Sequence, residues 1–160
     1  MMKRSFFITG TDTGVGKTIF SLLLAKYLIT KSKNINIIKP IQTGAMQNKG
    51  DLYFIKKYLG NNSKINYINY YTFTKPLAPW TLVKKYNYKI DIDFIRNDIK
   101  DRIQKSDFTI IEGLGGIYVP IAKDYFVFDL INDLDSDVIV VTKNILGTIN
   151  HTLLTMRKIL

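Results

Sequence analysis

The stretch GTDTGVGKT at residues 10–18 follows the apolar run Ser5–Thr9 and precedes a second apolar run that begins at Ile19. A glycine-rich turn ending in Gly-Lys-Thr between a strand and a helix is typical of a phosphate site, because its backbone N–H groups and the helix N-terminus attract anions. The usual spacing G-x-x-x-x-G-K-[ST] is not met, because Gly10 lies one residue too far from Gly16. The alternative is a glycine-rich turn that binds nothing.

Length and composition are typical of one globular domain, with 160 residues of which 46% are hydrophobic and 22% charged. The chain has no cysteine and one histidine, so any metal should be a hard cation bound by oxygen ligands. No apolar run reaches the roughly 18–20 residues that cross a bilayer, and Lys3-Arg4 leads into a strand-like run without a signal-peptide pattern. We expect a cytoplasmic protein with no membrane partner.

The formal charge of +10 raises the question of nucleic-acid binding. The lysines are scattered along the chain, however, with no basic tail or arginine-rich segment, and heavy use of Lys, Asn, Ile and Tyr indicates a compositional bias. We therefore expect no nucleic-acid partner.

Four short runs rich in β-branched or aromatic residues predict strands that are buried on both faces. These runs are residues 6–8, 35–38, 108–111 and 138–141. Thr18–Thr30 is apolar at nearly every position and predicts a buried helix in a parallel crossover, while isoleucines at helical spacing predict an amphipathic helix over Asp91–Lys105. Asn61–Tyr88 shows no clean period and is predicted to form loops with at most short elements. The expected fold class is α/β with a mostly parallel sheet flanked by helices.

Polar clusters follow each predicted strand, and in a parallel sheet these clusters meet at one edge, where ligands bind. The clusters are residues 10–18, 39–44, 112–116 and 142–150. In the first, Lys17 can reach β- and γ-phosphates, and the Thr18 hydroxyl can ligate Mg²⁺. Glu112 directly ends an apolar strand, where a Mg²⁺ shared with a nucleotide would supply the partner that a buried carboxylate needs. Asp51 is either another Mg²⁺ ligand or the N-cap of a helix over residues 52–59.

Lys39 follows the second predicted strand and has two interpretations. It is either a solvated lysine at a strand end or a second cation beside a transferring phosphoryl group, with Thr43 as a hydroxyl for substrate. His151 is predicted to lie in the first turns of a helix over residues 149–160, and we assign it no catalytic role, because geometry must come before pKa.

Five motifs in this order resemble the dethiobiotin synthetase family. They are G-T-D-T-x-V-G-K-T at 10–18, K-P-x-x-[ST]-G at 39–44, Y-T-F-x-x-P at 71–76, E-G-x-G-G at 112–116 and L-G-x-I-N-H at 146–151. Together they span nearly the whole chain, and the offset glycine of the first is that family's own variant. The resemblance implies a three-layer fold of the P-loop NTPase type.

The activity implied by the resemblance is an ATP- and Mg²⁺-dependent ligase reaction of biotin biosynthesis. In that family CO₂ carboxylates an amine of 7,8-diaminopelargonate, the carbamate attacks the γ-phosphate, and the neighbouring amine closes the mixed anhydride into the ureido ring. The family also implies a homodimer, with substrate bound across the interface.

The family's site residues carry over onto matching positions of this chain. Lys39 and Lys17 would be catalytic. Mg²⁺ would be held by Thr18, Asp51 and Glu112. ATP would be held by Gly14, Val15, Gly16, Lys17, Thr18, Ile19, Asp51, Glu112, Gly113, Leu114 and Gly115. Substrate would be held by Thr13, Thr43, Gly147, Thr148 and Asn150, with the amides of the 147–150 turn facing its carboxylate.

Three features depart from the family pattern. Leu114 stands where the family favours alanine, and Ala78 and Trp80 replace a Ser-Pro-His pattern around Pro79. Family members also continue for several tens of residues beyond the position of Leu160. We therefore expect residues 1–160 to be a single ATP-binding domain without the part that reads adenine, and to prefer ATP only weakly over other nucleotides.

Two other interpretations stay open. A partition or positioning ATPase of the related Walker-type family would act as a partner-switched binding protein, but such proteins usually carry an early lysine in the loop, where this chain has Asp12. A decayed homologue without activity is the third.

Overall fold

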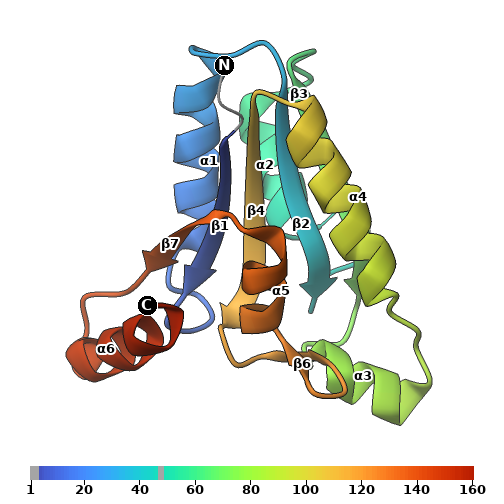
Figure 1. Ribbon diagram of the computed structural model, residues 1–160, viewed down its shortest axis with the longest axis vertical. Helices are drawn as coiled ribbons and strands as arrows, with labels where there is room; N and C mark the ends of the chain where they lie inside the picture. The colour runs from blue at the N-terminus through green and yellow to red at the C-terminus, as the bar shows by residue number, and fades with distance from the viewer. Residues whose placement is uncertain (1–3, 47–48) are drawn as a thin grey trace.

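The computed structural model describes residues 4–46 and 49–160. Five strands form one parallel sheet in the order β3-β2-β4-β1-β7 (Figure 1). These strands are β1 (Arg4–Gly10), β2 (Ile35–Thr43), β3 (Ile65–Phe73), β4 (Phe108–Gly116) and β7 (Asp137–Val141), and β5 (Pro120–Ala122) and β6 (Tyr125–Phe126) form a separate antiparallel pair. The helices are α1 (Lys17–Ile29), α2 (Asp51–Leu59), α3 (Pro79–Tyr86), α4 (Ile92–Lys105), α5 (Val127–Leu134) and α6 (Thr148–Ile159).

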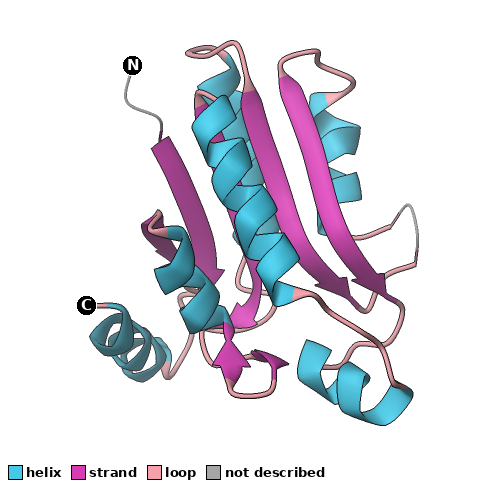
Figure 2. Ribbon diagram, turned by 45° about the vertical axis from the view of Figure 1, so that its right-hand side comes forward, coloured by secondary structure: helices cyan, strands magenta, loops and turns pink. Residues whose placement is uncertain are grey.

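Helices cover both faces of the sheet, because successive strand residues point to opposite sides. Ile8 packs in a cluster with Leu28 of α1 and with α2, whereas its neighbour Phe7 packs in the cluster that includes Ile99 of α4 and Leu130 of α5. Figure 2 shows the resulting layers of helix, sheet and helix. The predicted α/β class and the four predicted strands are confirmed. The helices predicted at Thr18–Thr30 and Asp91–Lys105 are confirmed as α1 and α4.

The prediction of loops over Asn61–Tyr88 is wrong, since this segment contains the nine-residue strand β3 and the helix α3. β3 lies at the sheet edge and pairs with β2 from Ile35↔Ile65 to Thr43↔Phe73. Only its two end residues are buried, and its exposed Asn and half-buried Tyr residues show no clean alternation. In α3, Pro79 is the first helical residue, a position where proline is favoured.

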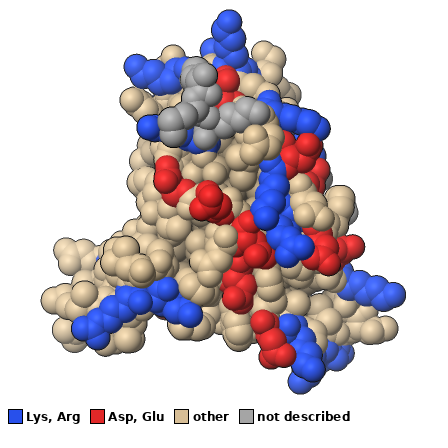
Figure 3. All heavy atoms as spheres, in the orientation of Figure 1, with Lys and Arg blue, Asp and Glu red and all other residues tan. Residues whose placement is uncertain are grey.

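Charged side chains lie close together along α4, where acidic and basic residues pair at helical spacing. Arg96 binds Asp93 at 2.7 Å, and Lys105 binds Asp101 at 2.6 Å. Figure 3 shows the same interleaving of the two charge types on the side of the molecule that α4 covers. Within the described residues, no helix is both long and apolar enough to cross a bilayer.

Candidate active site

A cavity of about 610 Å³ lies at the carboxyl edge of the sheet, within the size range of small-molecule sites. It is bordered by the 10–18 loop, the end of β2, the start of α2 and the end of β4. Twelve of the predicted site residues line it: Thr13, Gly14, Gly16, Lys17, Thr18, Ile19, Lys39, Thr43, Asp51, Glu112, Leu114 and Gly115. The polar cluster after β1 and those that form the ends of β2 and β4 therefore meet in one space, while the binding roles of these residues stay predictions. Lys39 and Glu112 were expected to come directly after their strands, but they lie within β2 and β4, which extend to Thr43 and Gly116.

The 10–18 loop is shaped by glycines and closed by the start of α1. Gly14 and Gly16 have φ values of 69° and 109°, which L side chains rarely adopt, and Gly16 is the N-cap residue of α1. No acidic side chain lies in the first turn of α1, so its positive end is free to attract an anion. The Lys17 ammonium donates to the carbonyls of Asp12 at 2.8 Å and Gly115 at 2.9 Å.

Gly10 has a packing role in this loop. A Cβ atom at this position would lie 2.7 Å from Val15 Cγ2, 3.2 Å from Lys17 Nζ and 3.2 Å from the Val141 carbonyl oxygen. The first glycine of the motif therefore ends β1 and lets the loop fold back closely, whereas Gly14 and Gly16 supply the unusual backbone angles.

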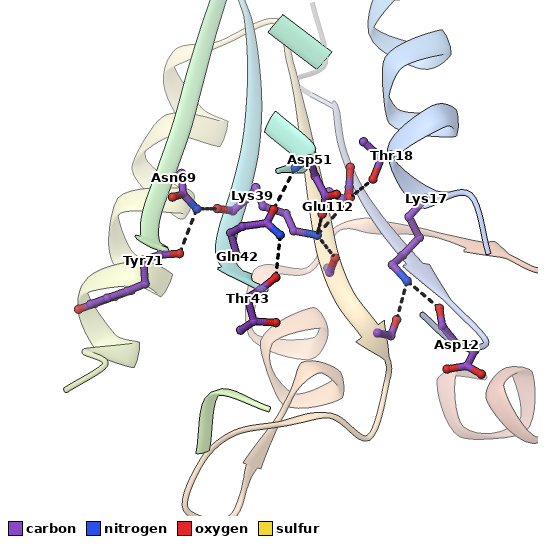
Figure 4. A network of polar contacts seen from close by, with 12 residues as sticks. Asp12, Lys17, Thr18, Lys39, Gln42, Thr43, Asp51, Asn69, Tyr71 and Glu112 are labelled. Atoms are coloured by element: carbon purple, nitrogen blue, oxygen red, sulfur yellow. Dashed lines mark hydrogen bonds and ion pairs between the residues drawn. The ribbon is translucent and has the colours of Figure 1, made fainter. Parts of the chain in front are cut away.

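Lys39 is the centre of a buried ion cluster (Figure 4). Its ammonium lies 2.7 Å from Asp51 Oδ2 and 3.1 Å from Glu112 Oε1, and it donates to the Gly113 carbonyl at 2.7 Å. The side chains of Lys39 and Glu112 are 4% and 2% exposed, whereas that of Asp51 is 32% exposed. One cation thus joins the ends of β2 and β4 to the first residue of α2.

The electrostatic environment keeps Lys39 charged and makes Lys17 unusually easy to deprotonate. Burial opposes the charged form of Lys39, but the charges of Glu112 and Asp51 outweigh it and raise the pKa of its ammonium. Burial also opposes ionisation of Asp51, yet the charge and hydrogen bond of Lys39 lower the pKa of that carboxyl. For Lys17, burial and then the nearby charge of Lys39 lower the pKa to about 8. A polyanionic ligand would relieve the penalty on the Lys17 ammonium.

The residues around Glu112 fit a magnesium ion. The Thr18 hydroxyl donates to Glu112 Oε1 at 2.8 Å, and the carboxylate of Asp51 reaches the same cluster through Lys39. Glu112 Oε2 is buried and has no hydrogen-bond partner among the described residues. Hydroxyl and carboxylate oxygens are ligands that Mg²⁺ prefers, with waters and substrate phosphates as the rest of its shell. In residues 4–46 and 49–160, no group of three or more His, Cys, Asp or Glu side chains is placed to hold a metal by itself.

The structure decides two interpretations that the sequence left open. Lys39 is not a solvated lysine, because it is only 3% exposed as a whole residue. Asp51 is not an N-cap, because Gly50 takes that position and the Asp51 carboxylate points to Lys39. Glu112 also has partners within the protein, since Lys39 and Thr18 both contact one of its oxygens, and the expectation of a Mg²⁺ partner stays a prediction.

Some predicted residues are not among those that line the cavity. Gly113 contributes through its backbone carbonyl, which Lys39 contacts, and Val15 packs close to Gly10. The predicted substrate residues at the start of α6 lie outside the cavity lining of this chain: Gly147, Thr148 and Asn150. His151 lies exposed on α6.

Two residues of the cluster were not identified by sequence reasoning. Gln42 lines the cavity and accepts a hydrogen bond from the Asp51 backbone N–H at 3.0 Å. Asn69 donates from its side chain to the Lys39 carbonyl at 2.7 Å, in a part of the strand pair where Pro40 has no N–H to offer. Gln42 could have been found from its place within the 39–44 segment, whereas Asn69 lies in the segment that was predicted to form loops.

Nearly the whole chain matches known proteins. A family model described as an AAA domain matches residues 4–159. The ATP-dependent dethiobiotin synthetase of Methanococcus vannielii is 41% identical over 150 residues, which cover 94% of this chain and 70% of that protein. The chain belongs to the dethiobiotin synthetase family. The enzyme of the same name from Methanocaldococcus jannaschii is 40% identical over 154 residues, covering 94% of this chain and 71% of its own length.

Among solved structures, the kinase domain of the Escherichia coli tyrosine kinase ETK has a TM-score of 0.61 at 15% identity, covering 98% of this chain and 62% of that chain. This likeness concerns the fold alone. The dethiobiotin synthetase matches therefore favour that family over the partition-ATPase interpretation. Two of the departures from the family pattern, Leu114 and Ala78, line the cavity, so they are placed to affect what it binds.

Proposed function

We propose that this chain catalyses the ATP-dependent closure of the ureido ring of dethiobiotin from 7,8-diaminopelargonate and CO₂. The observation that carries the proposal is the buried Lys39, held by Asp51 and Glu112 beside the glycine-rich loop. A permanently charged ammonium next to a phosphate cradle suits a reaction in which a carbamate oxygen attacks a γ-phosphate, because both reactants are anionic.

The nucleotide would bind with its phosphates on the N–H groups of the 10–18 loop and on the positive end of α1. Lys17, now held by two backbone carbonyls, would turn to the phosphate oxygens and neutralise the charge that develops on them. Thr18, Asp51 and Glu112 would hold Mg²⁺, which supplies charge neutralisation and orients the phosphates when it is bound. The side chains in these roles, Lys17, Thr18, Asp51 and Glu112, all border the cavity.

The substrate amines would lie on the Lys39 and Thr43 side of the cavity. The Lys39 ammonium would stabilise the carbamate, and the Thr43 hydroxyl would orient the diamine. Leaving phosphate departs as the second amine attacks the mixed anhydride, so the protein's task is to hold the two amines and the phosphate close together and away from water.

The direct test is turnover of 7,8-diaminopelargonate with MgATP and bicarbonate, followed by mass spectrometry of the product and by phosphate release. We expect a product, formed in step with phosphate, that is heavier than the diamine by one carbonyl group less two hydrogen atoms, because each ring nitrogen loses one hydrogen. ATP hydrolysis that the diamine does not stimulate would support a different use of the same nucleotide site. No hydrolysis and no product, from a folded chain, would favour the inactive-homologue interpretation.

We also propose that a second copy of this chain completes the substrate site through the start of α6. The apolar side chains near it are unusually exposed, with Leu146 at 103% and Ile149 at 75%. Gly147 is the N-cap of α6, and the first turn of that helix has no acidic residue, which suits a carboxylate ligand. A homodimer of this kind would bury the apolar residues and bring the Gly147–Asn150 turn to the partner's cavity.

Mixing two inactive variants tests this shared site. Lys17→Ala chains lack a phosphate contact, and Asn150→Ala chains lack a contact to the substrate, so a heterodimer contains one site with both defects and one with neither. We expect mixing to restore up to about half of the activity per heterodimer, measured on affinity-purified mixed dimers. Inactive heterodimers, with dimerisation verified by mass, would rule out a site that is built from both chains.

A further inference from the structure

The start of α2 has no cap of its own. Its N-cap residue is Gly50, which has no side chain, and no side-chain cap bond is made there. The first N–H of the helix, that of Asp51, donates instead to Gln42 Oε1 at 3.0 Å, from a residue nine positions earlier at the end of β2. A strand residue therefore accepts from the first N–H of the helix, whereas a local Ser, Thr, Asp or Asn cap would accept from the second or third.

The Gln42 carboxamide is packed against this helix start as well as bonded to it. Gly50 has a φ of 119°, and a Cβ atom there would lie 3.0 Å from Gln42 Cδ and Oε1. The other end of the same amide donates to the Thr43 carbonyl at 3.0 Å. One side chain thus joins the backbone of the predicted substrate residue Thr43 to the backbone of Asp51, as Figure 4 shows.

The core contacts of α2 begin after Asp51, with Leu52 and Leu59 partly buried against the cluster that contains Ile55. Ile55, the buried residue of this helix, is 1% exposed and lies one turn beyond Asp51, while Asp51 itself lies at the cavity. The first turn of a helix frays readily without a cap, because its N–H groups have no partners inside the helix. Asp51 itself is not part of the core, and it is held by Gln42 at its backbone N–H and by Lys39 at its carboxylate.

We infer that Gln42 is a positioning residue, which holds the first turn of α2 so that the Asp51 carboxylate points to the magnesium site. The inference rests on the proposed function, in which Asp51 is a Mg²⁺ ligand. Groups that orient a metal ligand from outside the coordination shell typically change metal affinity by about 10–100-fold when they are removed. Gln42 is expected to act within that range, through Asp51 and without contacting the metal.

A double-mutant cycle on magnesium affinity tests this. The four proteins are the unmodified chain, Gln42→Met, Asp51→Asn and the double variant, each saturated with a non-hydrolysable ATP analogue and titrated with Mg²⁺ by calorimetry. Methionine keeps the length of the side chain and removes both hydrogen bonds. We expect Gln42→Met to weaken Mg²⁺ binding by about 10–100-fold when Asp51 is present and by less than about threefold when Asp51 is Asn, because a positioning effect needs the ligand that it positions.

Analogue affinity in EDTA and melting temperature are measured alongside, with Gln104→Met on the exposed side of α4 as the matched control. An equal loss of Mg²⁺ affinity in both Asp51 backgrounds would mean that Gln42 acts by general destabilisation, which overturns the inference. Unchanged Mg²⁺ affinity in Gln42→Met, together with weakened Mg²⁺ affinity in Asp51→Asn, would also overturn the inference. Unchanged affinity in Asp51→Asn would instead refute the proposed metal role of Asp51, and the inference with it.

Discussion

Lys17→Ala is expected to lower ATP-dependent turnover by about 10²–10³-fold, which corresponds to roughly 3–4 kcal/mol of transition-state stabilisation. Lys17 is 7% exposed at the floor of the phosphate loop, and its partners in the structure are two backbone carbonyls. A lysine whose burial lowers its pKa to about 8 gains most when phosphate oxygens replace those carbonyls. Alanine removes this cation, while the loop glycines and the N-terminus of α1 remain in place.

Initial rates of phosphate release, with ATP varied at saturating diamine, measure the effect. Lys26→Ala is the matched control, because Lys26 lies on the same helix with its side chain exposed, and it should leave the rate unchanged. A circular dichroism spectrum and a melting curve should show that both variants fold. Full activity in a folded Lys17→Ala protein would contradict the assignment of this loop as the γ-phosphate site.

The sequence predicted those helices and strands whose pattern of apolar and polar residues can be seen within the element itself. Strands β1, β2, β4 and β7 contain short runs that are mostly apolar, because both faces of the sheet pack against hydrophobic clusters there. Asp91 was included in the predicted helix Asp91–Lys105, and the structure places it one residue outside as the N-cap, where its side chain accepts the Phe94 N–H at 2.9 Å. The prediction that the polar clusters meet at one edge of the sheet followed from the parallel direction of its strands.

What the sequence did not predict depends on partners far away in the chain. β3 is stabilised by its pairing with β2 at the sheet edge, and its Asn and Tyr residues resemble a loop when that partner is unknown. α5 has its buried residues at helical spacing, Val127, Leu130, Ile131 and Leu134, but it is only eight residues long, and no element was predicted there. The burial of Lys39 was equally hidden, because it results from Asp51 and Glu112, which lie 12 and 73 positions away.

Lys39→Met is expected to have two large effects that respond differently to magnesium. Methionine fills the space of the lysine but removes the charge between Asp51 and Glu112, leaving two carboxylates close together and one of them 2% exposed. Breaking a buried ion pair by removing one partner destabilises a protein by about 3–5 kcal/mol. For a chain of this size, that is a fall in melting temperature of roughly 6–20 °C. Turnover should also fall by about 10²–10³-fold, because the cation beside the carbamate and the transferring phosphoryl group is lost.

Magnesium separates these effects, because a bound divalent cation can neutralise the two carboxylates but cannot replace an ammonium on the substrate side. We expect millimolar Mg²⁺ with an ATP analogue to raise the melting temperature of Lys39→Met by more than it raises that of the unmodified protein, while turnover stays low under the same conditions. Lys100→Met, at an exposed position of α4, is the control for removing a lysine charge. If turnover recovered together with stability, Lys39 would have only a structural role. A melting temperature that did not fall at all would mean that Asp51 and Glu112 do not need Lys39 as their counter-ion, contrary to the buried contacts of 2.7 and 3.1 Å.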